Sequence, residues 1–306
     1  MTRRFIVLGA AMIFACAVQA QPPGITREMV MRQLPLEGAP LAIAGAYEAV
    51  MEPVAGSPRL AVYRPAKLEA FPKNDTLPVV AWGNGGCALD STQFGGYLKT
   101  LASHGYVVVT TAAPEGANPP RATADDLRAA IDWSQAEATR SGSPLAGKID
   151  KEHVAVMGVS CGGFLTVALA SDPRVDTIGV FNSGVQAPAA GGDGNRAGAA
   201  FPTTEALAKI HGPTLYLNGG EPDFMMATSK ANFDAINNVP IFYGSRANAG
   251  HSATYFHPGG GEFANVAVAW LDWQLKGNKK VSAMFVGAKC GLCTNPNWET
   301  HAKNLK

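Results

Sequence analysis

The stretch VAVMGVSCGG, residues 154–163, joins an apolar run typical of a buried strand to small residues that continue into a helical pattern. It contains the pattern G-x-S-x-G, with Ser160 at the centre. On a sharp strand-to-helix turn the serine is exposed as a nucleophile, and small residues two positions away let the strand and the helix approach. The stretch therefore predicts a strand at 153–157, a nucleophile at Ser160 and a helix at 161–170.

The chain contains 34 glycines, so a chance match to this short pattern has to be weighed against the catalytic interpretation. The match directly follows a strand and opens a helix, which is the context that the chemistry requires. Cys161 is excluded as the nucleophile, because a shift by one residue would place Val159 where a small residue is needed.

Strand and helix patterns alternate on both sides of this turn. Apolar runs typical of buried strands lie at 60–63, 77–82, 106–111, 177–181, 213–217 and 239–243. Helical spacing of apolar residues occurs at 93–103, 124–138, 225–236 and 262–275. The alternation predicts one α/β domain over residues 21–306, with a mostly parallel central sheet and helices on both faces. The Gly/Ala-rich segment 187–200 is expected to be a flexible loop near the working edge of the sheet.

A base and an acid should follow Ser160, in the order serine, acid, histidine. Three of the six histidines come too early, and His251, His257 and His301 remain. His251 lies in a small, polar loop after the strand at 239–243, which favours it as the base over the runner-up, His257.

The acid is expected directly after the strand at 213–217. Asp223 is favoured over Glu221 as the carboxylate that holds the tautomer of the imidazole and stabilises the imidazolium. The developing oxyanion needs backbone donors. One is the N–H of Cys161, and the second is expected from the glycine-rich loop 83–87. That loop lacks the lysine of a phosphate-binding loop.

These segments together resemble the dienelactone-hydrolase-like branch of the α/β-hydrolases, and within it the bacterial cutinases and polyester hydrolases. The resemblance rests on residues 86–87, 98–105, 106–110, 125–133, 149–163, 214–223 and 250–251. It implies an α/β-hydrolase fold, a catalytic triad of Ser160, Asp223 and His251, and an oxyanion hole formed by the amides of Cys87 and Cys161.

The chain departs from this pattern at three positions. The polyester hydrolases usually carry an aromatic residue at the position of Cys87, a methionine at that of Cys161, and a tryptophan near Ser183 that clamps aromatic polyester units. The dienelactone hydrolases proper use a cysteine nucleophile instead of a serine. We therefore expect small or narrow esters as substrates rather than aromatic polyesters.

Four cysteines remain if residues 1–20 are removed as a signal peptide, and an even number in an oxidising compartment favours disulfides over metal sites. Cys87 and Cys161 are expected to pair, since two amides that converge on one oxygen bring their Cα atoms within reach of a disulfide. The alternative is two independent small side chains. Cys290 and Cys293 are expected to form a short staple, although Cys-Gly-Leu-Cys also resembles a redox motif.

The N-terminus has the composition of a signal peptide, with Arg3 and Arg4 before the apolar run 5–17 and small residues before a cleavage site after Ala20. Weaker resemblances to a twin-arginine signal and to a lipoprotein signal were the alternatives. The apolar run is short for a membrane span. The protein is therefore expected in the periplasm or outside the cell.

The composition is that of a globular protein, with 47% hydrophobic and 16% charged residues and a net charge of +1. This charge disfavours nucleic-acid partners. The sequence thus predicts a serine esterase that acts on a small-molecule ester without a cofactor or metal. The alternatives are a serine peptidase or amidase on the same fold and a non-catalytic binding protein.

Overall fold

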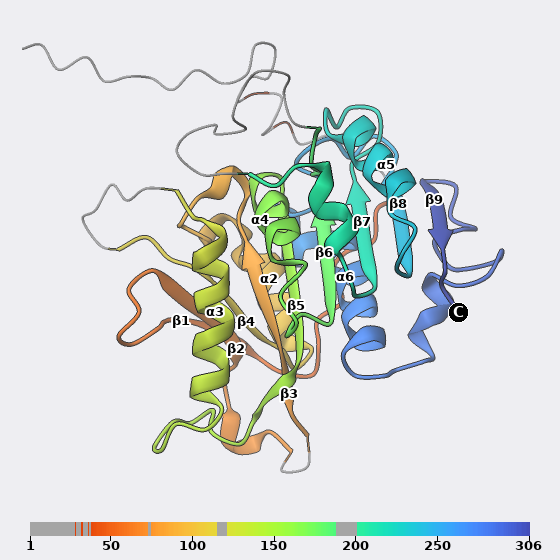
Figure 1. The fold of residues 1–306 in the computed structure, drawn as a ribbon. Helices are drawn as coiled ribbons and strands as arrows, with labels where there is room; N and C mark the ends of the chain where they lie inside the picture. Colours follow the sequence, from red (N-terminus) through yellow and green to blue (C-terminus); the bar gives the residue numbers. More distant parts are fainter. Residues whose placement is uncertain are drawn as a thin grey trace, which may run out of the picture.

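The computed structural model describes residues 38–72, 75–114, 121–187 and 201–306, together with the isolated positions 28, 32 and 36. These residues form a nine-stranded sheet in the order β1-β2-β4-β3-β5-β6-β7-β8-β9 (Figure 1). The strands are β1 (Ala49–Pro53), β2 (Leu60–Pro65), β3 (Leu77–Gly83), β4 (Val107–Thr111), β5 (Ile149–Val159), β6 (Thr177–Phe181), β7 (Thr214–Asn218), β8 (Ile241–Arg246) and β9 (Trp298–Lys303).

The centre of the sheet, from β4 to β8, is parallel, while β1, β2 and β9 pair in the antiparallel sense. Every residue of β3, β4, β6, β7 and β8 is buried. Strands covered on both faces need apolar side chains on both faces, which is why these runs stand out in the sequence.

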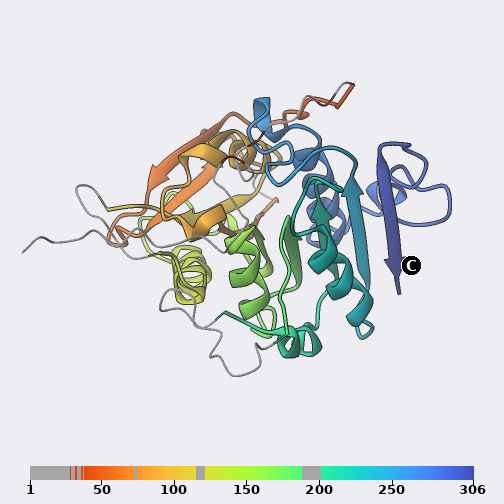
Figure 2. The same cartoon turned by 90° about the horizontal axis from the view of Figure 1, so that it is seen from above.

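Helices cover both faces of the sheet, as the view from above shows (Figure 2). The helices α2 (Gly95–Ser103) and α6 (Gly261–Gln274) pack on one face, and α3 (Ala124–Glu137), α4 (Cys161–Leu169) and α5 (Met226–Ala235) pack on the other. Short 3₁₀ turns lie at Leu68–Ala70, Gly85–Cys87, Thr92–Phe94, Thr204–Lys209, Pro258–Gly260 and Val281–Met284. The predicted fold class, a mostly parallel sheet with helices on both faces, is confirmed.

The sequence patterns failed at the two edges of the sheet. The strands β1 and β9 were not expected, and β5 begins at Ile149, earlier than the predicted 153. Both edge strands are largely half-buried or exposed. The strand β1 reads AVMEP, with only three apolar residues in a row, and β9 reads WETHAK, without an apolar run. Residues 1–20 and 188–200, which carry the predicted signal peptide and most of the predicted flexible loop, lie outside the described residues. No helix in the described ranges is long and apolar enough to cross a membrane.

Candidate active site

Ser160 lies on a strained turn between β5 and α4. Its backbone has φ 53° and ψ −119°, a conformation that costs energy for any residue with a side chain. The turn is as tight as the sequence pattern requires. A Cβ added at Gly162 would lie 2.0 Å from the carbonyl oxygen of Gly83, and one at Gly158 would lie 2.4 Å from that of Gly162. The glycines flanking Ser160 are therefore needed for β3, β5 and α4 to approach one another.

His251 follows β8 and reaches the serine across the carboxyl edge of the sheet. Its Nε2 lies 2.9 Å from Ser160 Oγ. Its ring is 3% exposed and stacks against the half-buried ring of Phe224, with 4.0 Å between the ring centroids. This contact and the surrounding loop hold the imidazole in one orientation towards the serine.

Asp223 follows β7, and its Oδ1 lies 2.8 Å from His251 Nδ1. The carboxylate is 2% exposed, and in the described part of the chain no lysine or arginine forms an ion pair with it. Its charge is instead stabilised by N–H donors: the amides of Gly219 and Met225 and the side-chain amide of Asn182, at 3.2, 3.1 and 2.8 Å. The structure thus joins Ser160, His251 and Asp223 in one hydrogen-bonded chain.

The competing residues from the sequence lie elsewhere. Glu221 is exposed, and His257 is half-buried in a turn, where its amide donates to the carbonyl of Thr254. Among the described residues no hydrogen bond joins either side chain to Ser160 or His251.

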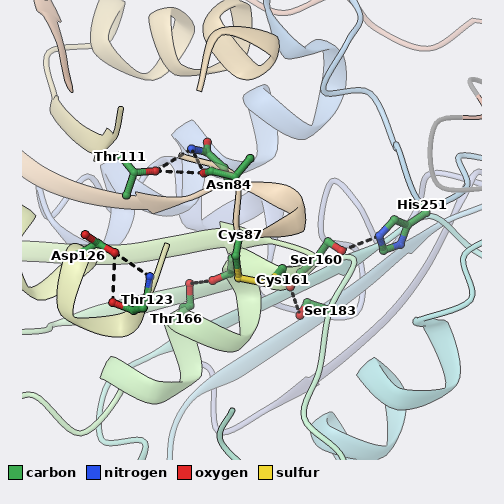
Figure 3. The surroundings of a disulfide bond; sticks show 12 residues. Asn84, Cys87, Thr111, Thr123, Asp126, Ser160, Cys161, Thr166, Ser183 and His251 are labelled. Carbon is green, nitrogen blue, oxygen red and sulfur yellow. Dashed lines mark hydrogen bonds between the residues drawn. A yellow bond between two sulfur atoms is a disulfide. The ribbon is translucent and has the colours of Figure 1, made fainter. Parts of the chain in front are cut away.

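A disulfide bridges the glycine-rich turn after β3 to the start of α4 (Figure 3). The predicted pair Cys87–Cys161 is present, with 5.1 Å between the Cα atoms, and both residues are buried. In the same view Ser160 lies beside the bridge and points to His251. The bridge therefore ties the two segments that were expected to supply the oxyanion donors.

The two amides differ in their present partners. Cys161 is the first residue of α4, where an amide has no acceptor within the helix. The amide of Cys87 donates a 3.2 Å hydrogen bond to the carbonyl of Asn84, so this amide already has an acceptor. Cys87 has φ 50°, in the left-handed region that non-glycine residues rarely adopt.

The sequence interpretation missed Asn84, which holds this turn in place. Its buried side chain accepts a hydrogen bond from Trp82 Nε1 at 3.0 Å and donates to the carbonyl of Ala88 and to Thr111 Oγ1, at 3.0 and 3.1 Å. Figure 3 shows the contact with Thr111 at the end of β4. The signal available in the sequence was a polar residue at the end of a buried strand. Its contact with Thr111, which ties the turn to β4, comes from another segment of the chain and could not be read from the sequence.

The second predicted pair, Cys290–Cys293, is also present, with a Cα separation of 4.9 Å. It lies in the turns before β9, and Cys290 packs in the core beneath α6 whereas Cys293 is exposed. Across the described ranges no group of three or more His, Cys, Asp or Glu residues could hold a metal ion.

Comparison with known proteins agrees with the geometry. Residues 76–299 match the family model described as PETase, PET hydrolase-like. Cutinase 2 from Thermobifida cellulosilytica is 39% identical over 73 residues, which are 24% of this chain and 27% of that protein, so the chain matches about a quarter of that relative's length. Because the family model spans most of the chain, the chain belongs to the PET hydrolase-like family, in the cutinase- and polyester-hydrolase-like branch of the α/β-hydrolases.

Proposed function

We propose that this protein is a serine carboxylesterase that cleaves its substrate through an acyl-enzyme on Ser160. The observation that carries the proposal is the hydrogen-bonded chain from Ser160 Oγ through His251 to Asp223, with both links under 3 Å. Membership of a family of ester-cleaving enzymes supports the reaction class. The strained turn at Ser160 supports its role as the nucleophile.

In this proposal Ser160 Oγ attacks the ester carbonyl carbon while His251 Nε2 takes the hydroxyl proton. Asp223 stabilises the imidazolium that forms. The tetrahedral intermediate collapses, the C–O bond to the alcohol breaks, and His251 gives its proton to the leaving alkoxide. Water then attacks the acyl-enzyme, His251 takes the water's proton, and the proton returns to Ser160 as the carboxylic acid leaves.

The amides of Cys161 and Cys87 are the proposed donors to the oxyanion. The amide of Cys161 lies at the N-terminus of α4, where the helix dipole adds to its effect. The amide of Cys87 would share its long hydrogen bond to Asn84 with the substrate oxygen. Since the disulfide joins both segments, we expect it to limit the motion of both donors before the reaction begins.

Small or narrow esters are the proposed substrates. Ser183 is fully buried and donates from Oγ to the carbonyl of Ser160 at 2.7 Å, so this position supports the nucleophile turn rather than presenting a flat aromatic surface. The half-buried ring of Phe224 against His251 provides one apolar wall. A serine peptidase or amidase remains the second candidate, because the same triad attacks both carbonyl classes.

Export of the protein is also part of the proposal. We infer that residues 1–20 are removed and that residues 21–306 act as one domain in the periplasm or outside the cell. Two disulfides support an oxidising compartment, because reduced thiols are the rule in the cytosol.

Labelling by an organophosphonate, followed by peptide mass spectrometry, tests the mechanism. We expect one adduct on Ser160, none in Ser160→Ala, and a loss of activity of about 10⁴-fold or more in Ser160→Ala. His251→Ala should be similarly inactive, while His257→Ala should retain most activity. Labelling at another residue would contradict the proposal, and an unlabelled wild type would favour a non-catalytic binding protein.

A substrate panel separates the reaction classes. p-Nitrophenyl esters of increasing acyl length should be cleaved with a preference for short chains, and peptide anilides should not. Efficient release of soluble aromatic acids from a polyester film would contradict the inferred narrow substrate range.

A further inference from the structure

Asn182 lies directly after β6 and occupies a position that the mechanism above does not use. Its side chain is fully buried, and its backbone has φ 45°, in the left-handed region. Asparagine tolerates this conformation better than most residues. A strained, buried polar residue persists where its contacts compensate for the strain, so those contacts indicate what it does.

The side chain of Asn182 links the acid to the loop that carries the base. Nδ2 donates to Asp223 Oδ2 at 2.8 Å and to the carbonyl of Gly250, the residue before His251, at 3.1 Å. Oδ1 accepts from the hydroxyl of Tyr255 at 3.0 Å. A backbone carbonyl can only accept, so the contact with Gly250 fixes the amide with its NH₂ group towards the carboxylate.

These hydrogen bonds form a second connection between Asp223 and the His251 loop, in addition to the hydrogen bond between Asp223 and His251. Asp223 Oδ1 binds His251, and Asp223 Oδ2 binds Asn182, which itself holds the His251 loop at Gly250 and at Tyr255. The acid is therefore fixed through both of its oxygens. Rotation of the carboxylate about its Cβ–Cγ bond would break bonds on both sides.

We propose that Asn182 is a positioning residue of the active site, which orients the Asp223 carboxylate and fastens the His251 loop to it. This inference rests on the proposed function, because it assumes that Asp223 and His251 act on Ser160. Asn182 contacts no reacting atom, and it acts through Asp223. In its absence the carboxylate loses one of its shortest hydrogen bonds, and the imidazole loses its fixed distance to the serine.

The charged and titratable groups around this cluster are few. Tyr255 is buried, and burial raises its pKa well above the ordinary value, so its hydroxyl stays protonated and can donate at neutral pH. Burial also raises the pKa of Tyr243, on β8. Arg246 and Glu262 form a buried ion pair beneath the same loop, with one charge of each sign.

Two variants of Asn182 test the proposal. Asn182→Gly removes the side chain and suits a positive φ, and we expect kcat to fall about 10- to 100-fold with KM within about threefold, since small displacements of a positioned group have effects of this size. Asn182→Asp keeps the shape but places a second carboxyl beside Asp223. Two carboxyls 2.8 Å apart cannot both ionise, so one of them keeps its proton and the new side chain can donate as the amide did. We therefore expect kcat of Asn182→Asp to recover to within about fivefold of the wild type.

Asn232 provides a matched control. It is equally buried, and it binds the backbone of Val185 at 2.7 and 2.8 Å, a few residues beyond Asn182, without touching the triad. Asn232→Ala should unfold at a lower denaturant concentration than the wild type. It should keep the wild-type kcat per active site and the wild-type pH dependence of kcat/KM. Tyr255→Phe, which removes only the hydroxyl bound to Asn182, should lower kcat about two- to fivefold if the network acts as one unit.

The experiment measures the rate at which an organophosphonate labels Ser160 between pH 5 and 9. The number of labelled sites gives the concentration of active sites, to which kcat is normalised. Absence of labelling in the wild type would overturn the proposed function itself. If the wild type is labelled and Asn182→Gly is labelled at the wild-type rate, only the role of Asn182 is overturned. If Asn182→Gly fails to fold, a wild-type labelling rate and a wild-type kcat in Tyr255→Phe would overturn it equally.

Discussion

The two disulfides of this protein have similar Cα separations and different structural roles. Cys87–Cys161 joins residues 74 positions apart, with 5.1 Å between the Cα atoms, and Cys290–Cys293 joins residues three apart, with 4.9 Å. Both members of the first pair are buried next to Ser160, whereas Cys293 of the second pair is exposed before β9. The first connects the 3₁₀ turn after β3 to the start of α4, and the second closes one local turn.

Sequence separation decides how much each bond constrains the unfolded chain. The chain-entropy relation gives about 4.5 kcal/mol for the separation of 74 and about 2 kcal/mol for the separation of three at 25 °C. The first bond in addition fixes a turn rich in glycine beside Ser160. From this comparison we expect an effect on catalysis only from the first disulfide, because only this bond joins segments of the candidate site.

The largest effect is expected from Cys87→Ser combined with Cys161→Ser. We expect a loss of about 4 kcal/mol in the free energy of unfolding, since the long loop is released. A fall in kcat of about 10- to 100-fold should accompany it, because the donor on the glycine-rich turn is no longer held. Urea unfolding and hydrolysis of p-nitrophenyl acetate measure the two quantities. A variant that is destabilised but keeps the wild-type kcat would show that this disulfide is not needed for catalysis.

A smaller effect is expected from Cys290→Ser combined with Cys293→Ser. The free energy of unfolding should fall by at most about 2 kcal/mol, and kcat should stay within twofold of the wild type, because no triad residue contacts this turn. The same urea and kinetic assays apply. If the wild type reduces insulin disulfides and this variant does not, the pair is a redox centre rather than a staple.

The smallest effect is expected at Asp126, which caps α3 beside the first disulfide. Its carboxylate binds Thr123 and Arg59, and the amide of Ala122 donates to the carbonyl of Cys87. Partial burial raises the pKa of Asp126, but the hydrogen bonds from Arg59 and Thr123 outweigh this, so the pKa lies below its ordinary value. A lowered pKa in the folded state means stability that is present at neutral pH and lost as the carboxylate is protonated.

Asp126→Asn should therefore cost about 1 kcal/mol of unfolding free energy at pH 7. The difference from the wild type should shrink below about pH 4, near the pKa of an unfolded aspartate. Urea unfolding at pH 7 and pH 3 measures both values. Glu299→Gln near the second disulfide is the control, because its pair with His301 is exposed and should contribute little. An equal cost at both pH values would contradict the charge-based explanation.

Much of the central fold could be predicted because the parallel strands are buried on both faces. Such strands must be apolar throughout, so β3, β4, β6 and β7 are visible as runs in the sequence. The edge strands β1 and β9 could not be found in this way. Their side chains face solvent in part, and their pairing partners rather than their composition make them strands.

The candidate triad was accessible from the sequence because each member lies in the segment that follows a predicted strand. Ser160, Asp223 and His251 come after β5, β7 and β8, and the carboxyl ends of parallel strands meet at one edge. Their catalytic roles remain a prediction for the experiments above. Asn182 also directly follows a strand, β6, but nothing in its neighbourhood along the chain distinguishes it from an ordinary turn residue.

The sequence by itself determined the buried strands at the centre of the sheet and the tight turn at Ser160, because these depend on local spacing and on residue type. It also predicted both cysteine pairs. The tertiary structure decided the edge strands β1 and β9, where the amide of Cys87 donates, and that Asn182 binds Asp223. Asn182 and Asp223 are 41 residues apart in the sequence. Contacts of this kind form only when packing brings strand ends together, since a hydrogen bond depends on distance in space and leaves no local pattern.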